Sequence, residues 1–469
     1  MSIQKNGASI AQKILIRGRI HLDSPLLIGA GKGSEDPDHI VDTPIMRGYG
    51  NRPMIPGTSL AGVLRSALGI QESGCEERLF GCMAETEDSS WQSLADVSDI
   101  VFTDSVGVAH RDGVAIDAVA GTAKTGKKYN FEVLERGASA NLEIILTVRE
   151  AQKNKILDKD IKRLVDMLKS GFKLGAGTAK GLGKVHCAPV CAVWYDFEKD
   201  EAIEAWLKRD SDSLQNIDKW KHSIQNKLNF YEGKEEKVYN PNDFIIDADF
   251  DLTSSLLVRK GSAEMKDGSS VTVMQKSREE YLIPGSSLKG VLRQHAAYVL
   301  SLFGRDESFL NDMMGFAKEE NHEGKKSRLF VEEVYINPED VLARKQSRNS
   351  IDRFTGGTIK EMLLTEEPIW KTGDNRNVPI SMHFGLQDCS EEWEAGLMLF
   401  LLRDLWDGRI AIGGDKAIGR GTLKGCRAAV HYKRGSFEIL EDGTVTGTDV
   451  SILDKWAKSF YDYMMQKDR

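Results

Sequence analysis

The sequence predicts an α+β fold that is built twice along the chain. The segment 55–65 (IPGTSLAGVLR) returns as 283–293 (IPGSSLKGVLR), and the two copies differ only at their fourth and seventh positions. A glycine-rich loop follows each copy further along the chain, at 175–183 (GAGTAKGLG) and again at 413–421 (GGDKAIGRG). Two motifs in the same order at nearly the same separation indicate a tandem duplication. We therefore expect both halves to bind the same kind of ligand.

The first half shows the patterns of strand, helix, strand, hairpin insertion, helix and strand. Residues 12–28 alternate apolar and polar side chains, which indicates a strand. Ser59 is placed to cap a helix that continues to Leu68, and residues 160–172 form an amphipathic helix. The other expected segments are a strand at 100–104, a hairpin insertion at 114–149 and a final strand at 184–190. This order is that of a ferredoxin-like (RRM-type) unit with insertions.

The second half repeats this order. Its expected segments are strand 244–258, helix 287–303, strand 329–336, insertion 349–386, helix 391–406 and, after the glycine loop, strand 422–431. The charged stretch between the halves carries Trp206 and Trp220, which are uncommon in flexible linkers, so we expect a structured helical connector. The expected division is a first domain at 1–195, a connector at 196–243, a second domain at 244–435 and a C-terminal helical tail at 436–469.

The composition is typical of a soluble globular protein. The chain has 469 residues, of which 41% are hydrophobic and 29% charged. No apolar run is long enough to span a membrane, and the N-terminus lacks a signal-peptide core, so we expect a cytoplasmic protein with no membrane partner. The net charge of −8 argues against a non-specific polyanion binder. Basic residues nevertheless gather between Arg409 and Arg434, so charge alone leaves RNA binding open.

The cysteines leave a zinc site open but do not favour it. Six are present, and none forms a Cys-x-x-Cys pair. His186, Cys187 and Cys191 could contribute to a metal site, but they lie in a strand-like run that Pro189 interrupts. Buried free thiols are the favoured interpretation.

The glycine loops and the helix starts together suit a phosphodiester backbone. Glycine has no Cβ, so backbone N–H groups in such a loop can approach an anion closely. Ser59 and Ser287 offer donors near helix N-termini, where the helix dipole favours negative charge. Arg65 and Arg293 follow about two turns later, with Lys289 in between. The alternative is that the glycines form turns with no ligand. Neither loop is a nucleotide-binding P-loop, because the Gly-Lys-Ser/Thr ending is missing.

The paired motif, IPG[ST]SLxGxxR followed by a glycine-rich loop, resembles the RAMP superfamily of CRISPR-associated proteins. More narrowly, the chain is similar to backbone subunits of type III effector complexes that polymerise along the guide RNA, with two such domains fused. The resemblance implies three kinds of partner: a guide RNA (crRNA), a complementary target RNA and other effector subunits. It also implies that the protein reads the RNA backbone and its A-form shape while base pairing supplies the sequence.

The resemblance assigns the guide phosphates to the helix starts and the glycine loops. The implied RNA-binding residues are Ser59, Arg65, Gly175, Gly177, Lys180, Gly181, Gly183, Ser287, Lys289, Arg293, Gly413, Gly414, Lys416, Gly419, Arg420 and Gly421. It further implies a thumb-like β-hairpin in each domain that wedges into the guide–target duplex. Residues 116–121 (IDAVAG) and 351–356 (IDRFTG) look like this element.

The resemblance also implies a catalytic residue. Family members that cut target RNA use an aspartate in the loop between the first strand and the IPG helix, and Asp42 matches their Asp-x-Pro context. Asp42 is therefore the expected catalytic residue and metal ligand, with Mg²⁺ or Mn²⁺ as the cofactor. A cation near the scissile phosphate would help to activate the 2′-hydroxyl or stabilise developing charge. Asp36, Asp38 and His39 in the same loop are lesser candidates.

The second half departs from this pattern. Its position equivalent to Asp42 is Ser270, and the nearest carboxylate is Asp267. The second domain either does not cut, which we expect, or cuts with Asp267 after a shift of the loop. Two alternatives to a cleaving subunit stay open. The chain is a non-catalytic RNA-binding scaffold in the first, and a guide-processing endoribonuclease in the second. The available histidines for the latter are His21, His39 and His110.

Overall fold

The structure of the chain is a computed structural model. It describes residues 8–31, 41–71, 74–82, 92–103, 106–117, 122–153, 158–209, 220–222, 228–235, 240–264, 270–316, 323–360, 362–373, 380–433 and 435–466. The chain divides into two compact units. Unit 1 comprises Met1–Ala115, Lys124–Thr178 and Leu182–Val238, and unit 2 comprises Ile116–Ala123, Ala179–Gly181 and Tyr239–Arg469.

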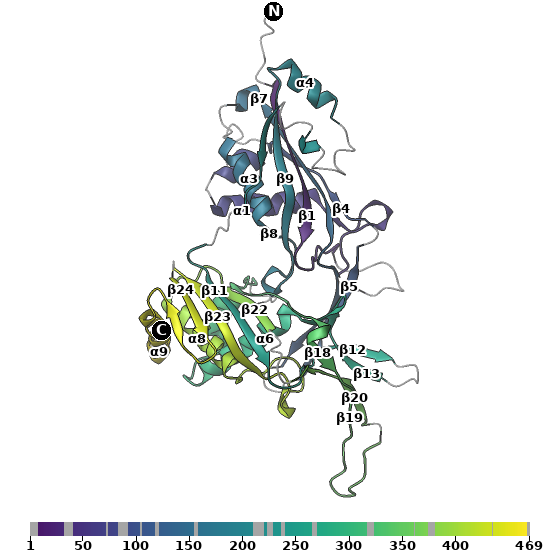
Figure 1. The fold of residues 1–469 in the computed structure, drawn as a ribbon, viewed down its shortest axis with the longest axis vertical. Helices are drawn as coiled ribbons and strands as arrows, with labels where there is room; N and C mark the ends of the chain where they lie inside the picture. Colours follow the sequence, from purple (N-terminus) through teal and green to yellow (C-terminus); the bar gives the residue numbers. More distant parts are fainter. Residues whose placement is uncertain are drawn as a thin grey trace, which may run out of the picture. The chain divides into compact units, whose positions relative to one another are not determined.

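Unit 1 is built on an antiparallel sheet with the strand order β10-β9-β1-β7-β3, in which β8 also pairs with β9 (Figure 1). The strands are β1 (Ile10–Leu22), β3 (Ala95–Val97), β7 (Ser139–Arg149), β8 (Phe172–Lys173), β9 (Lys184–Asp196) and β10 (Asn229–Glu232). In β1, Ile14 and Ile16 enter the main core, whereas Leu15 enters a smaller core. Because successive side chains of a strand point to opposite faces, both faces of β1 are covered.

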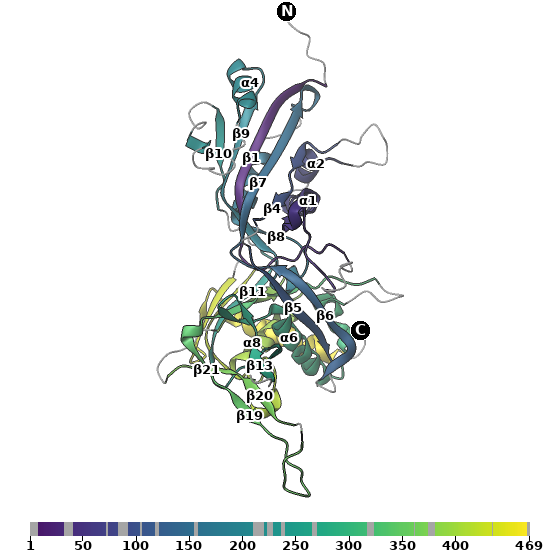
Figure 2. The same cartoon turned by 90° about the vertical axis from the view of Figure 1, so that its right-hand side faces the viewer.

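Helices α1 (Gly57–Gln71), α2 (Cys75–Phe80) and α3 (Asp158–Ser170) lie over one face of this sheet (Figure 1 and Figure 2). Their apolar side chains form the main core of unit 1 together with those of the sheet. The apolar face predicted for α3 is the buried one, since Ile161, Leu164, Val165 and Leu168 all lie in the main core. The segment before α1 is anchored by β2 (Met54–Ile55), which pairs with β4 (Ile100–Val101).

The segment expected to connect the halves packs on the other face of the same sheet. Helix α4 (Asp200–Leu207) brings Trp206 into ring contact with Tyr195 of β9, with centroids 5.2 Å apart. Trp220 is buried in the same small core, and β10 extends the sheet beside β9. The described part of the segment therefore adds a strand as well as a helix to unit 1.

Unit 2 has a sheet with the strand order β16-β22-β11-β23-β24-β25 (Figure 1). The strands are β11 (Phe244–Leu252), β16 (Leu329–Val331), β22 (Ile380–Leu386), β23 (Leu423–Tyr432), β24 (Gly435–Leu440) and β25 (Val445–Gly447). Its first four members in this order correspond to β3-β7-β1-β9 of unit 1. The duplication read from the sequence is thus present in the strand order of the two sheets.

Three helices pack in the core of unit 2: α6 (Gly285–Ser301), α8 (Glu392–Trp406) and α9 (Ser451–Met465). The short helix α7 (Asn311–Met314) adds Met313 and Met314 to this core. The expected helical tail differs from the structure, because β24 and β25 precede α9 and extend the sheet. Phe437 of β24 and Trp456 of α9 are both buried, and their ring centroids lie 5.7 Å apart. This aromatic contact packs the tail onto the core of unit 2.

Smaller strands form insertions in each unit. In unit 1, β5 (Val108–Ile116) pairs with β6 (Ala123–Leu134) as a hairpin (Figure 2). In unit 2, the order β12-β13-β20-β19 makes a separate sheet from Arg259–Glu264, Ser270–Met274, Leu364–Glu367 and Gln346–Arg348. The remaining short strands are β14 (Lys276–Ser277), β15 (Glu280–Ile283), β17 (Val334–Ile336), β18 (Val341–Ala343) and β21 (Ile369–Lys371).

The first strand of each unit is shorter than the sequence predicted. β1 ends at Leu22 and β11 at Leu252, after which Leu26 and Leu256 form isolated bridges to Leu134 and Ile369. The chain leaves the sheet here because the glycine loops hydrogen-bond to these segments. The alternation of apolar and polar residues continues beyond the end of each strand, which is why the sequence predicted longer strands.

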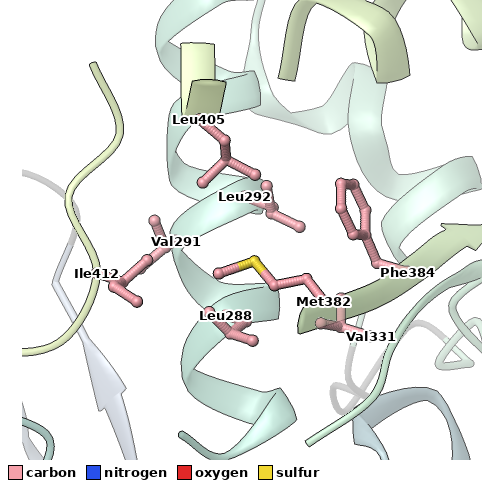
Figure 3. A pocket seen from close by; sticks show the side chains of 8 residues that line it. All are labelled: Leu288, Val291, Leu292, Val331, Met382, Phe384, Leu405 and Ile412. Carbon is pink, nitrogen blue, oxygen red and sulfur yellow. The ribbon is translucent and has the colours of Figure 1, made fainter. Parts of the chain in front are cut away.

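The interior of unit 2 contains a small apolar void between α6 and the sheet (Figure 3). Its volume of about 10 Å³ is roughly that of one water molecule, too little for a ligand. No helix within the described residues is long and apolar enough to cross a membrane.

Candidate nucleic-acid interface

The helix that carries the repeated IPG motif begins at the glycine in both units. A Cβ on Gly57 would lie 2.0 Å from the Val97 carbonyl oxygen, and one on Gly285 would lie 2.6 Å from that of Val331. The two valines lie in the equivalent strands β3 and β16. The glycine is therefore required by close packing of the helix start against the sheet edge.

The two helix N-termini differ in what they offer an anion. The N–H of Gly57 donates to Asp99 Oδ1 at 2.7 Å, which places a carboxylate at the start of α1. Helix α6 has Pro284 at its N-cap and no side-chain capping bond, and its first turn carries no acidic residue. The prediction that Ser59 caps α1 is wrong, because Ser59 is the third residue of the helix. Asp99 could not be recognised as the capping group from local sequence patterns, because it lies 42 residues further along the chain than Gly57.

The arginines of the two motifs also differ. Arg65 is exposed and lines an open depression of about 420 Å³ beside Glu76 and Glu77. Arg293 is bound within unit 2, where it donates to Glu307 Oε1 at 2.9 Å and to the carbonyl oxygen of Gly315 at 2.6 Å. Arg65 is thus the more accessible of the two predicted phosphate contacts.

Lys289 has no counterpart in unit 1, where position 61 is alanine. Its Nζ donates to the Leu329 carbonyl oxygen at 2.9 Å, and the side chain is half-buried. Burial, reinforced by neighbouring positive charge, lowers the pKa of Lys289 from 10.5 to about 7. An RNA phosphate at this amine would favour its charged form.

The glycine loops are packed against the segments that follow β1 and β11. A Cβ on Gly183 would lie 1.9 Å from the Leu174 carbonyl oxygen, and one on Gly421 would lie 1.8 Å from that of Ile412. The same equivalence holds at the loop starts, where Gly175 and Gly413 approach the carbonyl oxygens of Leu27 and Leu257. The glycine spacing thus reflects a packing requirement that both units share.

Several loop N–H groups already have protein partners. The N–H of Gly183 donates to Pro25, that of Gly421 to Ser255, that of Gly414 to Leu257 and that of Gly419 to Lys416. These four amides are therefore not available to a phosphate in this conformation. Of the other residues predicted for these loops, Lys180 is exposed, Gly177 is half-buried and Gly181 is buried. Lys416 is exposed as a residue, although partial burial of its amine lowers its pKa.

Arg420 departs most from its predicted role. Its side chain is 3% exposed and its Nη1 donates to Glu366 Oε2 and to Asp415 Oδ2, both at 2.8 Å. Arg420 is therefore a structural ion-pair partner, whereas Arg259 and Arg348 are accessible cations next to this loop, in addition to the exposed Lys416 within it. Sequence reasoning missed these two arginines because they come from strands far from the loop in sequence.

Asp42 is exposed and held by a reciprocal pair of hydrogen bonds with Asn130 of β6. The Asn130 N–H donates to Asp42 Oδ2 at 2.8 Å, and the Asp42 N–H donates to Asn130 Oδ1 at 2.7 Å. The other loop candidates, Asp36, Asp38 and His39, lie outside the described residues, as does Asp267. Within the described part of the chain, no group of three or more His, Cys, Asp or Glu side chains is arranged to hold a metal ion.

The lone carboxylate nevertheless matches one mode of cation binding. Mg²⁺ commonly binds through one or two carboxylates together with substrate phosphates and waters, without a complete protein cage. Asp42 is exposed, so RNA could supply the remaining ligands, and the cation would then be held only in the RNA complex.

Of the histidines considered for guide processing, His21 lies on β1 and His110 on β5, and His39 lies outside the described residues. His21 of β1 stacks on His186 of β9, with ring centroids 5.1 Å apart, and its Nε2 lies 2.7 Å from the Ala188 carbonyl oxygen. His186 Nδ1 faces Asp23 at 2.9 Å. His110 is exposed on β5, and all six cysteines are free thiols.

Two comparisons with known proteins bear on this arrangement. A model of the RAMP superfamily matches residues 19–186 and again residues 249–424. The protein named CRISPR system Cms endoribonuclease Csm3 from Enterococcus italicus is 26% identical over 193 residues, which are 37% of this chain and 88% of that relative. The resemblance to CRISPR-associated RAMP proteins is thereby confirmed. Because the family model matches twice and covers most of the sequence, this chain belongs to the RAMP superfamily and carries two RAMP repeats.

Proposed function

We propose that this protein is a guide-RNA-binding backbone subunit of a type III CRISPR effector complex, in which two ferredoxin-like modules hold consecutive stretches of one guide. The observation that carries this proposal is the duplicated pairing of an IPG helix start with a glycine loop. In both units the loop packs against the segment that follows the first strand. The Csm3 relative supports the assignment to an effector complex.

The accessible cations of each module would bind the guide backbone. In unit 1 these are Arg65 at the depression on α1 and the exposed Lys124, Lys127 and Lys128 on β6. In unit 2, the uncapped start of α6 and Lys289 lie on the same turn of helix. Phosphate contacts of this kind are independent of sequence, which leaves base pairing to select the target.

The β5–β6 hairpin and the loop between β19 and β20 would serve as the thumb elements of the two modules. Phe354 in the latter loop is fully exposed, as expected for a side chain that meets a partner. Residues 118–121 of the first expected thumb lie outside the described residues. The proposed module boundaries are 1–195 and 244–435. The connector at 196–243 and the tail at 436–469 are additions to the first and second module.

We further propose that unit 1 cleaves the target RNA at Asp42. Asn130 fixes one carboxylate oxygen of Asp42, so Oδ1 can accept a hydrogen bond from the 2′-hydroxyl next to the scissile phosphate. As its proton passes to Asp42, that oxygen would attack phosphorus, form the O2′–P bond and break the P–O5′ bond. The leaving O5′ would take a proton from water, giving a cyclic 2′,3′-phosphate and a 5′-hydroxyl. A bound Mg²⁺ or Mn²⁺ would neutralise charge on the phosphate. Unit 2 has Ser270 at the matching position and is proposed not to cut.

Sequencing the RNA that copurifies with the native protein tests the main proposal. A repeat-derived tag joined to variable spacers is the expected result, because a backbone subunit retains its guide. Random cellular RNA, or no RNA at all, would contradict guide binding. Cleavage of precursor repeat RNA by the isolated protein would instead favour the guide-processing alternative.

A further inference from the structure

Five charged side chains form a cluster around the second glycine loop, all within unit 2. Arg259 begins β12, Arg348 ends β19 and Glu366 lies on β20. Asp415 and Arg420 belong to the glycine loop itself. The cluster therefore joins the loop predicted to bind RNA to the strands at the base of the β19–β20 insertion.

Each carboxylate of the cluster is shared among the arginines. Arg259 Nη2 lies 2.7 Å from Asp415 Oδ1 and 3.2 Å from Glu366 Oε1. Arg348 Nη2 lies 3.0 Å from Asp415 Oδ2 and also pairs with Glu366. Burial would raise the pKa of Asp415, but the guanidinium groups, that of Arg259 foremost, hold it below its ordinary value. Asp415 therefore stays ionised at neutral pH.

The cluster carries a surplus of positive charge, because three guanidinium groups share two carboxylates among these described residues. Arg420 and Glu366 are each 3% exposed and neutralise one another in the interior. The side chains of Arg259 and Arg348 are 52% and 35% exposed. The surplus is therefore on the solvent-facing arginines next to the loop. Gly414 brings the backbone against Arg259, since a Cβ there would lie 3.7 Å from its Nε.

In unit 1, the two loop positions that match Arg420 and Asp415 carry no charge. The position of Arg420 is taken by Leu182, and the position of Asp415 by Gly177. Leu182 packs in an apolar cluster with Leu27, Ile45 and Val133. Apolar packing is thus sufficient to fix the loop, whereas a buried ionic cluster carries a desolvation cost. The ionic cluster of unit 2 is therefore not explained by stability alone. Binding of an anionic ligand would explain it.

We propose that Arg259 and Arg348 form a phosphate-binding site for the backbone of single-stranded RNA beside the second glycine loop. Asp415 and Glu366 hold one edge of each guanidinium group, and the exposed edges face the ligand. A guanidinium group suits this role because its N–H groups match two phosphate oxygens at once. The proposal deepens the proposed function and rests on the chain binding RNA.

The test compares two double variants of the full-length protein that lose the same charge. R259Q/R348Q removes the proposed site, and R403Q/R427Q removes two partly exposed, ion-paired arginines of unit 2 outside the cluster. Binding of a labelled oligouridylate is measured over a range of salt concentrations. If each arginine neutralises one phosphate of a single strand, the slope of log K against log salt should fall by about 0.7 per arginine in the first variant. It should stay unchanged in the second.

The possible outcomes separate this site from the proposed function. Tight binding by the wild type with equal slopes in both variants would overturn the site and leave guide binding standing. If the wild type does not bind the oligouridylate, both the arginine site and the proposed guide binding are overturned. If R259Q/R348Q lowers the thermal unfolding temperature, the single variant R259Q decides, because Asp415 and Glu366 then keep two arginine partners. A slope equal to that of the wild type in R259Q would overturn the assignment of Arg259.

Discussion

At the residue scale, Asp42 has the clearest consequence for activity. D42A in a reconstituted effector complex should reduce one target cut by at least about 10²-fold, the contribution of a positioned acid–base group. Target binding should be unchanged, because the side chain is exposed and its loss leaves the Asn130 backbone in place. The cut is measured by mapping RNA fragments on a denaturing gel.

The matched control for this change is D200A, since Asp200 is an exposed aspartate at the start of α4, outside the elements proposed to contact RNA. This control should cut like the wild type. Undiminished cutting by D42A would remove Asp42 from the mechanism and support the scaffold alternative.

Lys289 should make RNA binding depend on pH. Its pKa in the free protein is about 7, and a nearby phosphate would raise it, so binding takes up a proton above pH 7. Affinity should therefore fall by up to about tenfold per pH unit as the pH rises from 7 towards the pKa of the bound form. Fluorescence anisotropy with labelled RNA at pH 6 and pH 8.5 measures this change.

K289R should abolish the pH dependence, because arginine stays charged throughout this range. Lys289 also makes the folding stability depend on pH, but in the opposite direction to RNA affinity. The unfolded chain holds this proton up to its ordinary pKa of 10.5, so the contribution of Lys289 to stability rises between pH 7 and 10.5. An unchanged pH profile in K289R would show that Lys289 does not contact the RNA.

At the element scale, the glycine loops should act mainly on stability. Gly421 has φ +76°, and a Cβ there would lie 1.8 Å from a backbone oxygen. G421A should therefore destabilise the protein by about 3 kcal/mol or more, from strain plus a clash with backbone that cannot move aside. Chemical denaturation followed by circular dichroism gives the free energy of unfolding.

Two other glycines provide graded controls for this prediction. Gly419 has φ +84° with open space around it, so G419A should cost only the strain of about 1–2 kcal/mol. Gly62 lies within α1 with nothing near its Cβ position, so G62A should stabilise by up to about 1 kcal/mol. A stable G421A variant that loses RNA binding would show that the loop glycines serve the ligand directly.

The order of elements was predictable because hydrophobic periodicity depends on local sequence. The apolar face of α3 followed from spacing, and the presence of a helix at each IPG motif followed from the repeat, although both helices begin at the glycine and not at the serine. The ends of β1 and β11 did not follow from either, because hydrogen bonds from the distant glycine loops end them. Likewise, Arg420 looked like a phosphate ligand in sequence, and only the fold brings Glu366 to it. Contacts between distant segments decide these cases, and no single-sequence pattern records them.

At the scale of the whole molecule, the two modules are similar in framework and different in chemistry. Unit 1 has a carboxylate at its helix start, an apolar cluster under its loop and an exposed aspartate in the loop before the helix. Unit 2 has an uncapped helix start, Lys289 and a cationic cluster. This division is consistent with cutting at the first module and stronger guide retention at the second.

If both modules hold one strand, affinity should depend on RNA length in two stages. An oligouridylate that reaches only one module gains the contacts of that module. Once the strand is long enough for both, the second contact becomes intramolecular, and affinity should rise by roughly 10²–10⁴-fold. A variant that combines K289A with R259Q/R348Q should lose most of this second rise, because it removes three of the cations of unit 2 that are proposed to hold the strand. Titration with oligouridylates of increasing length measures both stages, and a smooth, proportional increase in both proteins would mean that the modules do not share one strand.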